Sequence, residues 1–502
     1  MKKSRLGYGR YWTNPMPENE LQQLESSGDI QTIPDLLKFL NKNYANLVAI
    51  TSKNFSKTYF DMLNDVAKMQ SFLIAKEIKF GDIVGLHMKN EYAFITMFLA
   101  ITSMGAISMV FPLSMPGILI ANLIEKHHVR LLIYSDSLDK IYSSWNNKTQ
   151  VINTAKIENK GKEKNSTVKL TKNTIAALYF TGGTIGKPKI VTLTHRNLTR
   201  GMVNGAYGFP KILHLNYLTV IPFFHIFGLV RSLLTPLYTG SNNYICDEPK
   251  NFIHNFSIAH PDITCITPSL LEVICFFGEQ NKQLLGGKLK FIVCGGAHIP
   301  QSLLIRAAKL GIYASSGYGS TETTNLVSGN RFSLKRPHSV GYLFPHQKIK
   351  IVNGELWIKG DNVSPGYFFD KVNTNLAFDK GWFKTGDLVE YKNKNLYIIG
   401  RNTNTIVLPS GEKIFPEEIE AIFNDYSLIK DSLIYYEKGE LILEVYPYMN
   451  QNSNTKNVND LIKDYYEKTN RTLPMFMRIN KLIIRTTDFK RSPVMKILRN
   501  QQ

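Results

Sequence analysis

The alternation of apolar and polar positions in the first third of the chain predicts an α/β sheet. Amphipathic stretches of helical period at residues 36–47 and 60–77 alternate with short apolar runs such as residues 82–88 and 107–111. Helices between short buried strands are typical of a parallel sheet covered by helices. A polar stretch over residues 146–172 then predicts a surface connection to another apolar strand.

Residues 93–113 raise the question of a membrane span, because the segment has no charged residue and is long enough to cross a bilayer. Gly105 and Pro112 divide it into an apolar run of helical length and a short run that favours a strand. We therefore expect a buried helix that leads into a buried strand, and no transmembrane segment.

The pattern changes along the rest of the chain. Apolar runs at residues 217–224 and 289–297 each end in a turn, where open α/β sheets bind their ligands. Short strands after Ser339 indicate a barrel-like or antiparallel subdomain, and an α+β pattern begins at Gly400. The fold expected is an α/β chain: a large N-terminal domain of mixed sheets flanked by helices, with a β-barrel-like subdomain (1–399), plus a small α+β C-terminal domain (400–502).

Composition narrows the class of protein. The 502 residues are 43% hydrophobic, which is enough for more than one core. The net charge of +20 comes from lysines scattered along the chain, and no nucleic-acid-binding motif accompanies them, so no nucleic-acid partner is expected. The first twenty residues lack the apolar stretch of a secretory signal, which predicts a cytoplasmic protein. The cysteines have neither zinc-binding spacing nor a disulfide pattern: Cys246, Cys265, Cys275 and Cys294.

The stretch from Thr181 to Lys189, TGGTIGKPK, is the clearest chemical signal in the chain. A Gly- and Thr-rich loop after an apolar strand offers backbone N–H groups, hydroxyls and lysine charge to an anion. It is not a Walker A loop, because Pro188 follows Lys187 where that motif has a Ser or Thr to hold Mg²⁺. Taken alone, the loop indicates anion binding or merely a tight turn.

This loop resembles the signature loop of the adenylate-forming (AMP-binding) superfamily of acyl-CoA synthetases and aryl-CoA ligases. Further segments match that superfamily in order: PFFHIFGL (222–229), CGGAHIP (294–300), GYGSTETT (317–324), GELWIKG (354–360), GWFKTGDLVEY (381–391), GRNTNTIVLPSGEKIFPEEIE (400–420) and FKRSPVMKILR (489–499). The resemblance implies a large N-terminal domain, a small mobile C-terminal domain and an active site between them.

The resemblance also implies roles for individual residues. Glu322 resembles the residue that coordinates Mg²⁺, a hard cation suited to a carboxylate and phosphate oxygens, and Thr321 the residue that bonds the α-phosphate. Asp387 resembles the acid that accepts hydrogen bonds from the ribose hydroxyls, and Arg401 a nucleotide contact near the domain junction. The expected phosphate loop is Thr181, Gly182, Gly183, Thr184, Gly186 and Lys189; the expected adenine pocket is Tyr318, Gly319, Gly295, Gly296 and Ala297.

Lys496 parallels the lysine that bridges the carboxylate and the α-phosphate as charge shifts in the transition state. His225 resembles the histidine of the segment that lines the carboxylate site, and its apolar neighbours favour a fatty or aryl acid. The chain departs from the family pattern at Ile185, which removes a hydroxyl from the loop, and at Thr403, the hinge position, where Asp or Lys is usual.

These features predict an ATP- and Mg²⁺-dependent acid–thiol ligase. It would convert a small-molecule carboxylic acid into an acyl-adenylate, release pyrophosphate and pass the acyl group to coenzyme A. An alternative acceptor is the phosphopantetheine arm of a separate, acidic acyl carrier protein, which the positive net charge favours slightly. The third possibility is a relative that binds nucleotides or acyl-adenylates without catalysis. Retention of Lys189, Glu322, Asp387 and Lys496 together argues against it.

Overall fold

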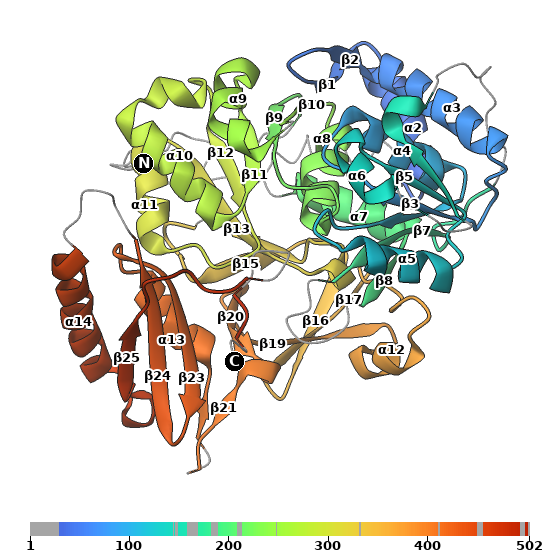
Figure 1. Cartoon of the computed structure of the whole chain (residues 1–502). Coiled ribbons are helices and arrows are strands. Elements are labelled where there is room, and N and C mark those ends of the chain that lie inside the picture. The colour runs from blue at the N-terminus through green and yellow to red at the C-terminus, as the bar shows by residue number, and fades with distance from the viewer. Residues whose placement is uncertain are drawn as a thin grey trace.

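The computed structural model describes residues 30–143, 145, 149–157, 169–181, 189–207, 213–246, 248–330, 333–409, 412–448, 455–491 and 497–499. Figure 1 shows a large upper part, blue to yellow, above the orange strands and helix that follow it and a red unit at the lower left. The chain passes from one to the next in sequence order.

The first sheet is the one that the apolar runs predict. Its six strands in the described residues follow the order β6-β5-β3-β4-β7-β8, and every neighbouring pair is parallel except β7 with β8. The strands are β3 (Ile83–His87), β4 (Ile107–Val110), β5 (Leu131–Tyr134), β6 (Gln150–Asn153), β7 (Ile175–Phe180) and β8 (Ile190–Thr194).

Helices between these strands supply the covering layers. The apolar segment at residues 93–113 becomes α4 (Tyr92–Ser103) followed by β4, both buried, as expected. Among the described residues, no helix combines the length and apolar character needed to cross a membrane. The other helices of this region are α2 (Ile33–Tyr44), α3 (Tyr59–Ala75), α5 (Gly117–Lys126), α6 (Asp139–Tyr142) and α7 (His195–Ala206).

A second, larger sheet begins with parallel strands and continues into antiparallel ones. Its parallel part joins β1 (Val48–Thr51), β10 (Asn242–Ile245), β9 (Asn216–Thr219), β11 (Ile263–Ile266), β12 (Phe291–Cys294) and β13 (Tyr313–Tyr318), and β2 (Ser56–Thr58) pairs with β1 at the edge. Helices of this region are α8 (Thr235–Tyr238), α9 (Phe252–Ala259), α10 (Pro268–Gln280) and α11 (Gln301–Lys309).

The antiparallel strands expected after Ser339 are present, but they do not form a sheet of their own. They extend the second sheet beyond β13 in the order β14-β15-β20-β19-β17-β16, so one hydrogen-bonded ladder runs through both regions. Their bounds are β14 (Ser328–Asn330), β15 (Ser339–Leu343), β16 (Gln347–Val352), β17 (Glu355–Gly360), β18 (Phe378–Asp379), β19 (Trp382–Lys392) and β20 (Asn395–Arg401), with α12 (Lys371–Ala377) between β17 and β18.

The C-terminal unit has its own sheet and core. Strands β23 (Ile429–Glu437), β24 (Glu440–Pro447) and β25 (Lys481–Ile484) form a three-stranded sheet, and α13 (Pro416–Asn424) and α14 (Thr455–Thr472) accompany it. A separate hydrophobic cluster with Phe423 and Leu443 fills its interior. A small ribbon, β21 (Ile406–Val407) with β22 (Lys413–Ile414), precedes it. These features support the α+β unit expected after residue 400.

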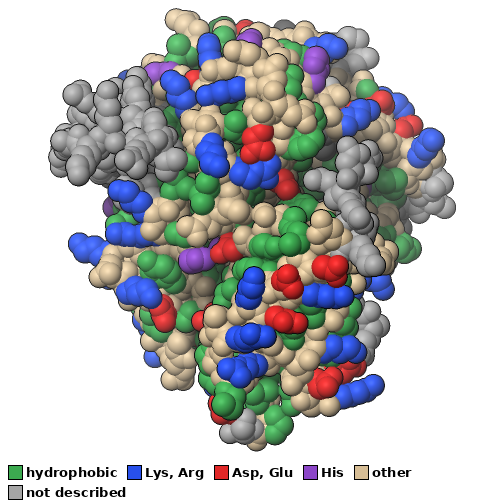
Figure 2. Space-filling model, turned by 90° about the vertical axis from the view of Figure 1, so that its left-hand side faces the viewer, with side chains coloured by type: hydrophobic (Ala, Val, Ile, Leu, Met, Phe, Trp, Pro, Cys, Tyr) green, Lys and Arg blue, Asp and Glu red, His purple; other side chains and the backbone are tan. Residues whose placement is uncertain are grey.

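Charged side chains of both signs are mixed over the face shown in Figure 2. Lysines and arginines lie among acidic residues there instead of forming one basic patch. The distribution on this face agrees with the scatter of lysines along the sequence.

Candidate active site

The two described ends of the predicted phosphate loop, Thr181 and Lys189, are joined by a backbone hydrogen bond. Strands β7 and β8 pair antiparallel with Phe180 opposite Ile190, and the Thr181 N–H donates to the Lys189 carbonyl over 3.0 Å. The loop therefore leaves and re-enters the first sheet at one point. Its predicted phosphate contacts Gly182, Gly183, Thr184 and Gly186 lie outside the described residues and stay predictions.

Lys189 and Glu322 are brought together by Tyr367, which the sequence did not single out. The Tyr367 hydroxyl donates to Glu322 Oε1 over 2.9 Å, and Lys189 Nζ lies 4.8 Å from the centre of the Tyr367 ring. Burial, together with the Glu322 carboxylate, raises the pKa of Tyr367 well above its usual range, so the hydroxyl stays a donor. Glu322, the predicted metal ligand, and Lys189, the predicted phosphate contact, therefore both contact Tyr367.

Glu322 stands on a short 3₁₀ turn, Thr321–Thr323, that tight backbone packing holds in place. A side chain at Gly319 is excluded there, because its Cβ would lie 1.5 Å from the carbonyl oxygen of Asn325. The Glu322 carbonyl accepts the N–H of Ser364 over 2.8 Å. Thr321 shares this turn with Glu322, as the sequence implies, and its role toward a phosphate stays a prediction. A carboxylate on a rigid turn beside a phosphate loop suits Mg²⁺, which prefers oxygen ligands.

Tyr318, Asp387 and Arg401 form a second cluster. The Tyr318 hydroxyl donates to Asp387 Oδ2 over 2.5 Å, and Arg401 Nε donates to Asp387 Oδ1 over 2.8 Å. Asp387 is only 4% exposed. The pKa of Arg401 is raised chiefly by the Asp387 carboxylate and to a smaller extent by Glu322. The pKa of Tyr318 is raised by burial and by Asp387. Both donors therefore keep their protons around the buried carboxylate.

The loop after β12 lies beside Tyr318 because β12 and β13 are parallel neighbours, with Cys294 opposite Ser316. The predicted adenine-pocket residues Gly295, Gly296 and Ala297 follow the end of β12 directly, and Gly296 has a φ of +90°, which favours glycine. A Cβ on Gly295 would come within 3.3 Å of the Phe227 ring. This loop therefore connects the predicted nucleotide side with the segment 222–228.

His225 lies in that segment and is half-buried, with its ring centre 4.4 Å from that of Phe224. The backbone just before it is fixed by side chains from the first sheet and its loops. Asn90 Oδ1 accepts the Phe223 N–H over 2.8 Å, and the Tyr179 hydroxyl donates to the Phe223 carbonyl over 2.9 Å. Burial of Tyr179 and Phe223 makes these bonds part of the core. The expectation that His225 meets the substrate carboxylate remains a prediction.

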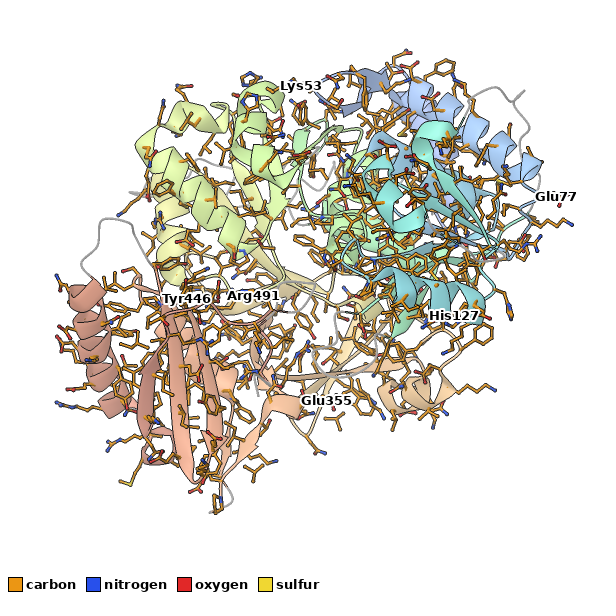
Figure 3. All side chains as sticks on the ribbon, viewed as in Figure 1. Lys53, Glu77, His127, Glu355, Tyr446 and Arg491 are labelled. Atoms are coloured by element: carbon orange, nitrogen blue, oxygen red, sulfur yellow. The ribbon has the colours of Figure 1, made fainter. Side chains whose placement is uncertain are left out.

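Lys496 lies outside the described residues, but the described residues on both sides of it are anchored. Before it, Arg491 Nη2 pairs with Asp431 Oδ2 over 2.5 Å (Figure 3 labels Arg491). After it, Arg499 Nη2 pairs with Glu420 Oε2 over 2.7 Å, and Glu420 is buried. These two ion pairs join Arg491 to strand β23 and Arg499 to helix α13.

Thr403, the predicted hinge position, lies in a 3₁₀ turn, Asn402–Asn404, right after β20. The neighbouring Asn404 side chain donates to Glu417 Oε1, and Glu417 Oε1 lies 3.2 Å from Arg499 Nη2. The turn that leaves Arg401 is thus linked through α13 to the C-terminal tail. Sequence motifs did not indicate this connection, because each partner lies far from the next along the chain.

The structure combines a large sheet-rich part and a small α+β unit with two clusters of polar side chains. The family model described as AMP-binding enzyme matches residues 39–368, which is more than half of the chain. The chain therefore belongs to the AMP-binding enzyme family.

Relatives and solved structures agree with this assignment. The 2-succinylbenzoate–CoA ligase of Geobacillus sp. (strain WCH70) is 26% identical over 405 residues, which cover 77% of this chain and 80% of that protein. A long-chain-fatty-acid–CoA ligase of Escherichia coli O6:H1 is 30% identical over 268 residues, covering 49% of this chain and 47% of the relative. The solved structure of an anthranilate CoA ligase in complex with anthranoyl-AMP has a TM-score of 0.84 at 17% identity, covering 93% and 96% of the two chains.

The predicted family and fold class are confirmed by these matches, and so is the prediction of an AMP-forming acid–thiol ligase of the acyl-CoA synthetase type. The individual site residues rest on the motif resemblance and on the contacts described above. They are carried forward as proposals.

Proposed function

We propose that the chain uses ATP and Mg²⁺ to activate a hydrophobic carboxylic acid, aryl or fatty, and transfers the acyl group to coenzyme A. The observation that carries this proposal is the convergence of Glu322, Tyr367 and Lys189 with Tyr318, Asp387 and Arg401. The first three residues suit a metal-bound triphosphate, and the second three suit a nucleoside. The relatives named above, whose names specify 2-succinylbenzoate and long-chain fatty acids, support both acid classes.

The chemistry requires the enzyme to turn a poor electrophile into a good one. Attack of the carboxylate oxygen on the α-phosphorus forms the acyl-adenylate and expels pyrophosphate, and the thiol then displaces AMP. We assign Asp387 to the ribose hydroxyls, because an ionised carboxylate only accepts hydrogen bonds. Glu322 would hold Mg²⁺, which when bound would neutralise charge on the phosphates.

Lys496 is assigned to the first half-reaction, where an ammonium can stabilise the charge that develops on the α-phosphate and the carboxylate. Its flanking residues belong to the small unit, so this proposal includes a boundary near residues 399 and 400 and a reorientation of the small unit between the half-reactions. The separate core of the unit supports such movement, since its hydrophobic interior is self-contained.

Pyrophosphate exchange over a panel of acids tests the activation step. The panel contains 2-succinylbenzoate, anthranilate and fatty acids of graded length, with ATP and Mg²⁺ present. Exchange with one class identifies the pocket, and exchange with none contradicts the proposal. Adding coenzyme A or an acyl carrier protein whose phosphopantetheine arm has a free thiol to the positive case then measures which thiol accepts the acyl group. We propose coenzyme A, and transfer only to the carrier protein would contradict that choice.

A further inference from the structure

Two histidines of the large part and one aspartate of the C-terminal unit meet at the junction of the two parts, and none of the three is assigned to ATP. His298 follows the Gly295–Ala297 loop, His338 directly precedes β15, and Asp425 lies at the C-terminal end of α13. One ligand atom from each of the three lies within 4.8 Å of the other two. Figure 1 shows the seam between α11 and the C-terminal sheet, where these elements come together.

The three groups are arranged without a short bond among them. The rings of His298 and His338 are parallel within 4°, with centres 5.8 Å apart, and His298 Nε2 is 3.9 Å from Asp425 Oδ1. That distance exceeds a hydrogen bond. Asp425 Oδ1 also accepts the N–H of Gln301 over 2.9 Å, so the carboxylate is oriented by the start of α11. The three ligand atoms are thus gathered within 4.8 Å of one another.

We propose that His298, His338 and Asp425 bind a divalent transition metal ion of the zinc, cobalt or nickel type, which joins the C-terminal unit to the large part. Imidazole nitrogens suit these ions, and carboxylate oxygen completes common sites. Ligand bonds of about 2.0–2.1 Å place tetrahedral ligand atoms roughly 3.4 Å apart. The ligand atoms now lie up to 4.8 Å apart. Side-chain movements of about an ångström would bring them to roughly 3.4 Å, and partly exposed side chains can make such movements.

The occupant is chemically distinct from the Mg²⁺ that accompanies ATP. Mg²⁺ prefers an octahedral shell of oxygen atoms and keeps much of its water, whereas this cluster offers two nitrogens and one carboxylate. A metal held here would fix the segment after Ala297 against α13. The site therefore acts on the relation between the two parts of the molecule and not on the phosphates.

The test uses the full chain, freed of metal by a chelator and kept without nucleotide or acid. Co²⁺ is titrated, and visible absorption reports ordered coordination; Zn²⁺ is expected to displace Co²⁺, and an excess of Mg²⁺ is not. His338→Ala and Asp425→Ala are each expected to weaken Co²⁺ binding at least about tenfold. The matched control is His254→Gln, which removes an exposed imidazole on α9 and is expected to leave binding unchanged.

Asp425→Ala decides the joining role, because Asp425 is the ligand from the C-terminal unit. Full Co²⁺ binding in that variant means that the histidines alone form the site, which overturns the proposal. Absent absorption bands in the wild type, or equal loss in His254→Gln, also overturn it. Melting curves of each variant without metal show whether it is folded. Since no substrate is present, failure here leaves the ligase proposal untouched, and failure of pyrophosphate exchange leaves the metal site untouched.

Discussion

Asp387→Asn tests the nucleotide assignment most directly. The Asp387 carboxylate is buried and already accepts bonds from Tyr318 and Arg401. An amide replaces one acceptor oxygen by a donor, so a ribose hydroxyl that donates to the carboxylate loses its partner. A hydrogen bond to a charged group contributes about 1.5–3 kcal/mol. Since about 1.4 kcal/mol is tenfold, we expect the KM for ATP to rise about 10- to 100-fold.

The assay is pyrophosphate exchange with ATP varied at saturating acid, accompanied by calorimetric titration with AMP. A ribose contact is made in both the ground and transition states, so kcat at saturating ATP should change far less than KM. The substitution also removes the charge opposite Arg401 and lowers the melting temperature. Melting curves therefore set the assay temperature at which the variant remains folded.

Asp361→Asn is the matched control, because Asp361 also pairs with an arginine, Arg196, over 2.8 Å but is 46% exposed at its side chain. We expect its KM for ATP to stay unchanged. If Asp387→Asn keeps the wild-type KM and AMP affinity while remaining folded, Asp387 does not hold the ribose. A fall in kcat with an unchanged KM would instead assign Asp387 to the chemical step.

Three further predictions concern Lys496, the ion pair of Arg499 and the dependence of stability on pH. Lys496→Ala should slow adenylation by roughly 100-fold or more, measured by pyrophosphate exchange, and should spare thioester formation from preformed acyl-adenylate. Arg499→Ala leaves Glu420 buried without its ion pair, so calorimetric melting should show the C-terminal unit destabilised by about 2–3 kcal/mol and adenylation slowed. Burial lowers the pKa of His195 to about 4, partly offset by Asp35, so denaturation curves should show stability falling from about pH 6.5 toward pH 4, by up to about 3 kcal/mol.

The sign of the pH effect follows from proton uptake. The unfolded chain protonates His195 near its usual pKa, while the folded chain keeps it neutral until about pH 4, so acid favours unfolding over that interval. His195→Gln should flatten this part of the profile, and an unchanged slope would contradict the argument. Equal loss of both half-reactions in Lys496→Ala would refute its assignment. Arg471→Ala, on an exposed pair, is the control for Arg499→Ala.

Local patterns predicted much of the fold. Apolar runs in the sequence predicted buried strands such as β3 and β4. The prediction that the helix before β4 ends near Gly105 was also confirmed. Strand pairing was less visible, because it depends on distant segments. The apolar pattern after Ser339 indicated antiparallel strands but not that β14 and β15 would extend the parallel sheet.

In the candidate site, too, local motifs were predictable from the sequence and contacts between distant residues were not. Motifs identified Tyr318, Asp387 and Arg401, and the structure brings them into direct contact. The role of Tyr367 could not be predicted, because its partner Glu322 is 45 residues away and no motif includes the tyrosine. The ion pair between Arg499 and Glu420 could not be predicted either, since Glu420 lies 79 residues earlier in the chain.

The continuous second sheet has a consequence for how such an enzyme can change its substrate. Tyr318, Asp387 and Arg401 belong to strands β13, β19 and β20 of that one sheet, and Figure 3 labels Glu355, whose carboxylate accepts the Gly386 N–H beside them. The segment 222–228 is fixed instead by Asn90 and Tyr179. If segment 222–228 lines the acid pocket as proposed, natural variation or laboratory selection can reshape that pocket by substitutions in one segment, while the strand ladder keeps the proposed ATP-binding residues in place.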